Sequence, residues 1–173
     1  GGSIKCWGYN WSGFLGDGTT TSRKTPVAVS GISNALYLGT GTENSCSVLT
    51  DGTVKCWGHN GNGQLGDGTT TNRNSPVSVS GITGATQVDG GYYSSCALLS
   101  NGTVKCWGMK GSYGYLGDGN IGVKTSPVSV GDLSSVSEGD AYNHTCVVTG
   151  GAVKCWGDND YGELGDGGTT NRS

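Results

Sequence analysis

The sequence predicts an all-β protein made of propeller blades, each with about four antiparallel strands. A long motif recurs along the chain, and repeats of this length are typical of propellers, solenoids and arrays. No segment has the apolar spacing of an amphipathic helix, and glycine accounts for 35 of the 173 residues. So much glycine would weaken any helix, which leaves strands and turns.

The recurring motif begins with Lys-Cys-Trp-Gly and has Leu-Gly-Asp-Gly near its end. Its four copies occupy residues 5–21, 55–71, 105–119 and 154–170. The Trp-Gly pairs are spaced by 50, 50 and 49 residues, at Trp7, Trp57, Trp107 and Trp156. One structural unit is therefore expected per repeat, and the strands can be assigned from any one copy.

Each repeat contains several segments with the pattern of a strand. Small apolar and polar side chains alternate in Pro-Val-x-Val and in Thr-Val-Lys-Cys-Trp. Short apolar runs open with Cys46, Cys96 and Cys146. A weaker strand is expected over residues 36–38, 86–88 and 136–138, which completes about four strands per repeat.

The order of these motifs resembles the repeat of the regulator-of-chromosome-condensation family of β-propellers. The resemblance rests on Gly-x-Asn-x-x-Gly-x-Leu-Gly-Asp-Gly-Thr, the Pro-Val that follows and the Ser-Cys-Ala-Leu hairpin. It covers essentially the whole chain and is strongest to the secreted bacterial branch, in which Cys-Trp-Gly replaces Trp-Gly. Members of the family include a nucleotide-exchange factor, a light sensor and an inhibitor of β-lactamases, so the resemblance implies a fold and not one activity.

The repeat arithmetic predicts that the chain is part of a larger propeller or assembly. Closed propellers have about four to eight blades, whereas the chain supplies about three and a half repeats. The expected division is a partial copy over about 1–25, followed by repeats over about 26–75, 76–126 and 127–173.

Six of the seven cysteines form three pairs at close spacing. A three-residue turn at Thr50–Gly52 would place Cys46 opposite Cys56, and a turn at Ser100–Gly102 would do the same for Cys96 and Cys106. The third hairpin is one residue shorter, and a two-residue Gly-Gly turn again aligns its cysteines, Cys146 and Cys155. Both turn lengths predict disulfides within each blade, which indicate an oxidising compartment: secreted, extracellular, cell-surface or periplasmic.

Cys6 is left over and occupies the position of Cys56, Cys106 and Cys155. It is therefore expected to be unpaired or bonded to another chain. Metal ligation by the cysteines is not favoured, because Cys-x-x-Cys and His-x-x-x-His spacings are missing from the sequence. Neither a metal nor a cofactor is expected.

The Gly-Asp-Gly aspartates are expected to close tight turns with their own side chains. Calcium is the alternative, for which only the cluster Asp158, Asp160 and Glu163 offers several nearby oxygen ligands. The repeated tryptophans are expected to be packing wedges. The two histidines lack a repeated nucleophile or carboxylate neighbour, so an enzyme is not predicted.

Composition also limits the partners. The formal charge is -3, with 10 basic and 13 acidic residues and no clustered basic surface, which argues against nucleic acid. No apolar stretch reaches the ~20 residues that a membrane-spanning helix needs. Four Asn-x-Ser/Thr sequons could accept sugar, at Asn10, Asn101, Asn143 and Asn171.

Two functions remain for a chain of this kind. The first is a non-enzymatic structural or protein-interaction scaffold that assembles with itself or another protein through its open ends. The alternative is a binding module or enzyme inhibitor that recognises a protein or a glycan through variable aromatic loops. Those loops lie after Trp-Gly and before each hairpin, and their candidate binding residues are Trp11, Phe14, His59, Tyr92, Tyr93, Tyr113, Tyr115, Tyr142 and Tyr161.

Overall fold

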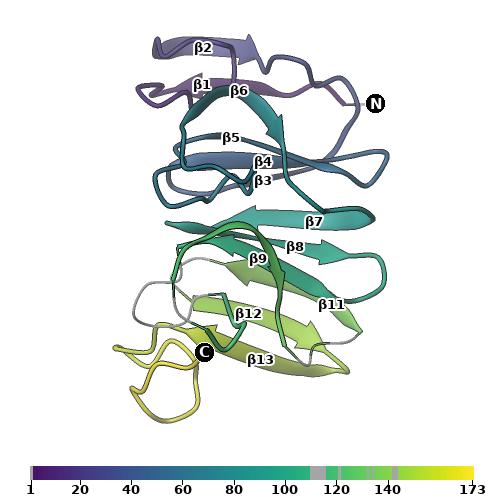
Figure 1. The fold of residues 1–173 in the computed structure, drawn as a ribbon, viewed down its shortest axis with the longest axis vertical. Helices are drawn as coiled ribbons and strands as arrows, with labels where there is room; N and C mark the ends of the chain where they lie inside the picture. Colours follow the sequence, from purple (N-terminus) through teal and green to yellow (C-terminus); the bar gives the residue numbers. More distant parts are fainter. Residues whose placement is uncertain (1, 110–115, 121, 132, 134, 142–143) are drawn as a thin grey trace.

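The computed structural model describes residues 2–109, 116–120, 122–131, 133, 135–141 and 144–173. Within those residues the chain contains thirteen β-strands and no helix, as the sequence predicts. The strands form four antiparallel sheets that follow one another in chain order along the long axis of the molecule (Figure 1). The arrangement is an open, propeller-like array of blades.

Two of the sheets are complete four-stranded blades. The first contains β3 (Ala35–Thr40), β4 (Asn44–Leu49), β5 (Val54–Gly58) and β6 (Arg73–Ser78). The second contains β7 (Ala85–Gly90), β8 (Ser94–Leu99), β9 (Val104–Gly108) and β10 (Lys124–Ser129). Each Pro-Val-x-Val strand begins three residues before its proline, because the preceding Arg73 or Lys124 already pairs with the glycine of Trp-Gly.

The two outer sheets have fewer strands. Strands β1 (Lys5–Gly8) and β2 (Arg23–Ala28) form a pair that corresponds to β5 and β6. At the other end, β11 (Val136–Ala141), β12 (His144–Thr149) and β13 (Ala152–Gly157) form a three-stranded sheet. The strands β3, β7 and β11 are those predicted as weak, and they run on through glycines that carry no strand signal of their own.

The hairpin registers and the three disulfides are as predicted. Val48 lies opposite Val54 and Cys46 opposite Cys56, while the glycine turn after Thr149 aligns Cys146 with Cys155. Disulfides join Cys46 to Cys56, Cys96 to Cys106 and Cys146 to Cys155. The first two disulfides therefore link the two middle strands of a four-stranded blade, and the third links β12 to β13 in the three-stranded sheet; each closes a short loop.

The apolar core lies between neighbouring blades. One cluster joins the Cys46–Cys56 disulfide, Val48 and Val54 to Val88 and Trp107 of the next blade. A second cluster joins the next disulfide to Val147 and Trp156 of the following sheet. Because each blade covers the apolar face of its neighbour, a blade on its own would leave half of this surface in water.

The blades approach most closely at a glycine of β3. A Cβ atom added to Gly39 would overlap the backbone carbonyl of Val88 on β7, so no side chain fits there. The glycines of these strands thus allow backbone to pack on backbone between blades. None of the described segments forms a helix long and apolar enough to cross a membrane.

Candidate binding face at the loop end

The variable loops of successive blades lie at one end of the sheets, here called the loop end. It comprises the loops at residues 9–14, 59–64 and 158–163 and the turns at residues 42–43 and 92–93. Loop and turn meet within a blade, since the backbone N–H of His59 donates to the carbonyl of Glu43 at 2.9 Å and that of Met109 to Tyr93 at 2.9 Å. The tight turns of the β4–β5, β8–β9 and β12–β13 hairpins lie at the opposite, hairpin end (Figure 1).

Each described long loop folds around one buried asparagine. The side chain of Asn60 is fully buried, and its Nδ2 donates to the carbonyls of Thr69 and Thr71, at 3.1 Å each. Its Oδ1 accepts the backbone N–H of Leu65 at 2.9 Å. Asn10 and Asn159 make the corresponding bonds in their own loops. A single amide therefore fixes two distant turns of the loop, which holds the exposed positions between them in place.

The aspartate of Gly-Asp-Gly closes the second half of the loop. Asp67 Oδ1 accepts the backbone N–H of Thr69 at 3.0 Å and its hydroxyl at 2.7 Å, as expected for a turn-closing aspartate. Its other oxygen pairs with Arg73 Nη2 at 2.7 Å. Burial disfavours the charged carboxylate, but the hydrogen bonds from Thr69 and Arg73 and the Arg73 charge outweigh it, so the pKa of Asp67 lies below its usual value.

The same pairing recurs in the other repeats. Asp17 pairs with Arg23 and Asp166 with Arg172, in each case six residues later, while Asp118 has Lys124 Nζ at 3.9 Å. Burial would raise the pKa of Asp17, but the hydrogen bonds from Thr19 and Arg23 outweigh burial and lower this pKa. Hydrogen bonds from the backbone N–H of Gly168 and from Arg172 lower the pKa of Asp166. The aspartates therefore stabilise the folded conformation of their loops.

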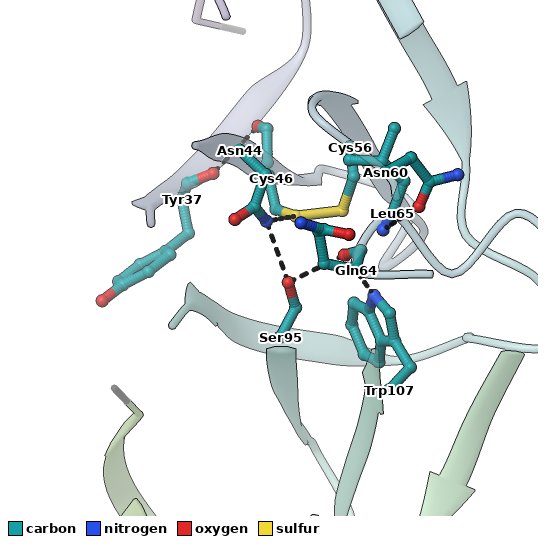
Figure 2. The surroundings of a disulfide bond; sticks show 10 residues. Tyr37, Asn44, Cys46, Cys56, Asn60, Gln64, Leu65, Ser95 and Trp107 are labelled. Atoms are coloured by element: carbon teal, nitrogen blue, oxygen red, sulfur yellow. Dashed lines mark hydrogen bonds between the residues drawn. A yellow bond between two sulfur atoms is a disulfide. The ribbon is translucent and has the colours of Figure 1, made fainter. Parts of the chain in front are cut away.

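Trp57 and Trp107 each fasten the loop of the preceding repeat to their own blade, as predicted for packing wedges. Figure 2 shows Trp107 of β9 donating its indole N–H to the carbonyl of Gln64, at 2.9 Å. Ser95 of β8 donates to the same carbonyl at 2.9 Å and accepts from Asn44 of the preceding blade at 3.0 Å. The indole lies against Gly66, where an added Cβ would be 2.8 Å from the ring. Trp57 bonds the carbonyl of Phe14 in the same way, whereas Trp7 is 63% exposed.

A polar cluster of Glu43, His59 and Gln64 lies within the β3–β6 blade on this face. His59 Nδ1 lies 3.2 Å from Glu43 Oε2 and 3.0 Å from Gln64 Nε2. Neutral His59 can accept from Gln64, and protonated His59 can donate to Glu43. A hydrogen bond with Tyr92, then burial, the charge of Tyr92 and that of Glu43 raise the pKa of Tyr93 in the following turn.

Exposed aromatic side chains stand beside these ordered groups. Tyr9 is 73% exposed, Trp11 57% and Tyr161 93%. Trp11 contacts Phe14 edge to face, with ring centroids 5.6 Å apart, and Tyr92 contacts Tyr93 at 4.2 Å. Large aromatic groups held on rigid loops are the usual anchors of a protein interface.

The predicted binding residues are thus distributed along one end of the array. Trp11, Phe14, His59, Tyr92, Tyr93 and Tyr161 all lie at the loop end, in loops and turns of four different sheets. Tyr113, Tyr115 and Tyr142 lie outside the described residues. The placement brings His59 together with Glu43 and Gln64, and Trp11 together with Phe14, while Tyr161 stands apart at the last sheet.

The acidic loop at residues 158–163 uses its carboxylates internally. Asp158 accepts the backbone N–H of Asp160 at 3.2 Å, and Glu163 accepts that of Tyr161 at 2.9 Å. Among the described residues, no group of three or more His, Cys, Asp or Glu side chains could hold a metal ion. These side chains shape the loop from within.

The sequons differ in accessibility. Asn10 is fully buried, with its amide bonded inside the loop, so it is closed to modification in the folded chain. Asn171 bonds Asp160 and the N–H of Asn159. Asn101 is exposed on the hairpin end, and Asn143 lies outside the described residues.

Three contributors to the face are not identified by the sequence analysis. The first is the buried asparagine, although its recurrence at Asn10, Asn60 and Asn159 signals it. The second is the arginine six residues after Asp17, Asp67 and Asp166. The third is the Glu43–His59 pair, which the predicted hairpin register already implies, because Asn44 lies opposite Gly58.

Comparison with known proteins agrees with this architecture. Models of the regulator of chromosome condensation (RCC1) repeat match residues 51–98 and residues 85–114. No curated protein matches the sequence significantly. The chain is 25% identical to human WBSCR16, whose crystal structure it matches with a TM-score of 0.85 over 99% of this chain and 47% of that one.

Two yeast structures are similar in fold. One is Prp20p from Saccharomyces cerevisiae, described with its binding to Gsp1p and histones, at 22% identity and a TM-score of 0.79 over 94% of this chain and 43% of that one. The other is the complex of Kap60 with yeast RCC1 (Prp20), at 21% identity and 0.81 over 99% and 45%. The chain spans less than half of the length of these structures. The likeness to the secreted bacterial branch stays a prediction, whereas residues 51–114 carry RCC1 repeats and the chain has the blade architecture of RCC1-type propellers.

Proposed function

We propose that this protein is a non-enzymatic scaffold that binds another protein through its loop end, in an oxidising compartment outside the cytosol. The observation that carries the proposal is the combination of rigid loops with exposed aromatic groups on one face. Tyr9 and Trp11 project from a loop fixed by Asn10, and Tyr161 from one fixed by Asn159. Because these loops are already ordered, binding loses little conformational entropy.

The compartment is inferred from the disulfides. One disulfide staples each of three successive sheets, and such bonds form and persist in secreted, cell-surface and periplasmic proteins. In the reducing cytosol all three would tend to open. A fold that uses one staple per repeat is therefore suited to the outside of the cell.

A binding role is also consistent with the similar proteins. The titles of the two yeast structures name protein partners, namely Gsp1p, histones and Kap60. On this chain the repeated polar groups, from Asn60 to Asp67 and Arg73, are used to fold the loops. Recognition therefore falls to the residues that differ between repeats, which are the aromatic and charged side chains of the loop end.

The test compares a triple variant at the loop end with a double control variant at the hairpin end, both in the oxidised chain. The loop-end variant carries Tyr9→Ala, Trp11→Ala and Tyr161→Ala, and the hairpin-end control carries Leu36→Ala and Val153→Ala, which are 65% and 68% exposed. Each immobilised chain is incubated with the extracellular protein mixture of its source. A true anchor should contribute about 1–2 kcal/mol to binding. Each ~1.4 kcal/mol corresponds to a tenfold change in affinity.

The proposal predicts a protein that is retained by the parent chain and the hairpin-end control but lost from the loop-end variant. Equal retention by all three chains would move the interface away from the loop end. Loss only from the hairpin-end control would place it at the opposite end. Loss of retention after enzymatic deglycosylation of the mixture would favour the alternative, a glycan-binding module.

A further inference from the structure

The turn between β3 and β4 carries a carboxylate with a single partner among the described residues. Glu43 Oε2 lies 3.2 Å from His59 Nδ1, and no other described side chain forms a hydrogen bond or an ion pair with that carboxylate. The Glu43 side chain is 25% exposed, so a molecule in solution can reach it. Neutralisation of the Glu43 charge within the described chain therefore depends on His59.

The Nδ1 atom of His59 has two neighbours that make opposite demands. Gln64 Nε2, a donor, lies 3.0 Å away, whereas the Glu43 carboxylate is an acceptor. A ring nitrogen either accepts or donates, so it cannot serve both. The Gln64 amide is fixed, because its side chain is fully buried and its Oε1 accepts the backbone N–H of Asn62 at 2.9 Å. Neutral His59 therefore accepts from Gln64 and leaves Glu43 without a donor.

The next turn places two tyrosine rings beside this carboxylate. The two turns touch, since a Cβ added to Gly41 would lie 2.5 Å from the carbonyl oxygen of Gly91. Tyr92 and Tyr93 are half-buried, and their rings meet edge to face. A hydrogen bond with Tyr92 is the main cause that raises the pKa of Tyr93, and burial and the charges of Tyr92 and Glu43 add to it. The field of Glu43 thus extends to the tyrosine pair.

The charge of the whole loop end has one sign. The five segments that define it contain four carboxylates and no lysine or arginine. Asp158, Asp160 and Glu163 each accept a hydrogen bond from a neighbouring N–H group of the chain. Lys110, in the loop of the third repeat, lies outside the described residues. Glu43 is therefore the loop-end carboxylate with most capacity for an external cation.

We propose that Glu43, with the Tyr92–Tyr93 pair beside it, binds an arginine side chain of the partner protein. This inference rests on the proposed function, because it names the chemistry that the partner presents to the loop end. The guanidinium pairs with both carboxylate oxygens, and its plane stacks on a tyrosine ring. Lysine has neither the planar fork nor the stacking face, so arginine suits a carboxylate beside aromatic rings better.

Protonation of His59 competes with the arginine. Histidine side chains take up a proton between about pH 8 and pH 5, and protonated His59 donates from Nδ1 to Glu43. The described titratable groups that face the site are Glu43 from the first turn, His59 from the loop after β5, and Tyr92 and Tyr93 from the next turn. Tyrosine hydroxyls are neutral and glutamate carboxylates charged from about pH 5 to 8. Arginine binding should therefore weaken as the pH falls through this range.

The probe is the peptide acetyl-Gly-Gly-Arg-Gly-Gly-amide, and its control carries citrulline, which has the shape of arginine without its charge. Each peptide is titrated at pH 8 and low ionic strength into the oxidised chain, and NMR follows the His59 ring and the Tyr93 amide. The arginine peptide should bind saturably, about tenfold or more tightly than the citrulline peptide. Glu43→Gln should abolish this difference. Asp51→Asn at the hairpin end should keep it, because Asn101 makes the same turn bonds in the next repeat.

The pH dependence tests the part played by His59. At pH 5 the parent chain should bind the arginine peptide about tenfold more weakly than at pH 8. His59→Asn should remove this loss, because asparagine can accept from Gln64 but cannot gain a proton. Other repeats carry Tyr, Met or Asp at this position, so the substitution is compatible with the fold. Equal binding of the two peptides, unchanged arginine binding in Glu43→Gln, or the same pH dependence in His59→Asn would each overturn the inference.

The partner assay distinguishes a failure of this inference from a failure of the proposed function. A partner that is lost from the loop-end variant but retained equally by Glu43→Gln and by the parent would refute the arginine site and leave the proposed function standing. A partner that the loop-end variant still retains would refute the proposed function, and the peptide titration would then decide the arginine site alone.

Discussion

Replacing Asn60 with alanine removes the amide on which its loop is built. The Asn60 side chain is fully buried, and the substitution leaves the N–H of Leu65 and the carbonyls of Thr69 and Thr71 without their partner. It also removes a bond of 3.2 Å to Asp67. The loop would lose the one group that ties its two halves together.

The expected loss of stability follows from those groups. An orphaned buried donor or acceptor costs about 1–3 kcal/mol. Leu65 is fully buried and bears this cost, while Thr71 is exposed and its carbonyl can turn to water. The free energy of unfolding should therefore fall by about 2–4 kcal/mol, and Tm by about 5–15 °C for a chain of this size.

Thermal and denaturant unfolding of the oxidised chain measure this change. The matched control is Asn62→Ala in the same loop, whose half-buried side chain is not the centre of such a network; it should alter stability by less than about 0.5 kcal/mol. Hydrogen exchange of the Leu65 amide should accelerate in the Asn60 variant alone. Equal stability and equal Leu65 exchange in both variants would refute the role given to Asn60.

Three further substitutions test the packing and the electrostatics. Gly39→Ala should destabilise the fold by about 2 kcal/mol or more, because its Cβ would overlap the Val88 carbonyl. The control Gly131→Ala, whose Cβ would meet no neighbouring atom, should be nearly neutral in the same denaturant assay. Equal effects of the two substitutions would contradict the close approach of the blades at Gly39. Trp107→Phe should lose about 1–2 kcal/mol with the Gln64 bond, and Trp11→Phe on the surface should lose almost nothing. Arg73→Gln should lower the free energy of unfolding at neutral pH, and this loss should shrink as the pH falls below about 4. The reason is that the pKa of Asp67 is lowered in the folded state. Such a carboxyl contributes stability above its unfolded pKa and loses this contribution as the pH falls through its folded pKa. Denaturant midpoints at pH 7 and pH 3 measure this, and a deficit that does not change with pH would show that Asp67 ionisation is not involved.

The strands and their registers could be predicted because they depend on local chemistry. Cysteine spacing and turn length together fix which residues face each other in a hairpin, and Cys46 and Cys56 lie opposite as expected. The weak strand pattern at residues 36–38, 86–88 and 136–138, by contrast, predicted strands of three residues, whereas β3, β7 and β11 have six. Glycines such as Gly39 extend these strands for a reason that lies in the next blade, which no local pattern reveals.

The loop end could be predicted only as a location. Repeat symmetry places equivalent loops at one end, so the position of Trp11 and Tyr161 follows from the sequence. The role of Asn60 does not, because its bonds reach residues nine and eleven positions away along a path that only the folded loop defines. The exposure of Leu38 and Trp7 likewise depends on what stands beside β1, and equivalent residues in other repeats are buried.

The central claim is that this is a disulfide-stapled array of RCC1-type blades built for an oxidising compartment. Alkylation of the protein from its native source, without reductant, followed by intact mass and peptide mapping tests it most directly. The account predicts that Cys46, Cys56, Cys96, Cys106, Cys146 and Cys155 stay unlabelled and appear as three linked peptide pairs. Free thiols in any two of those three pairs would contradict both the proposed oxidising compartment and the use of one disulfide per blade.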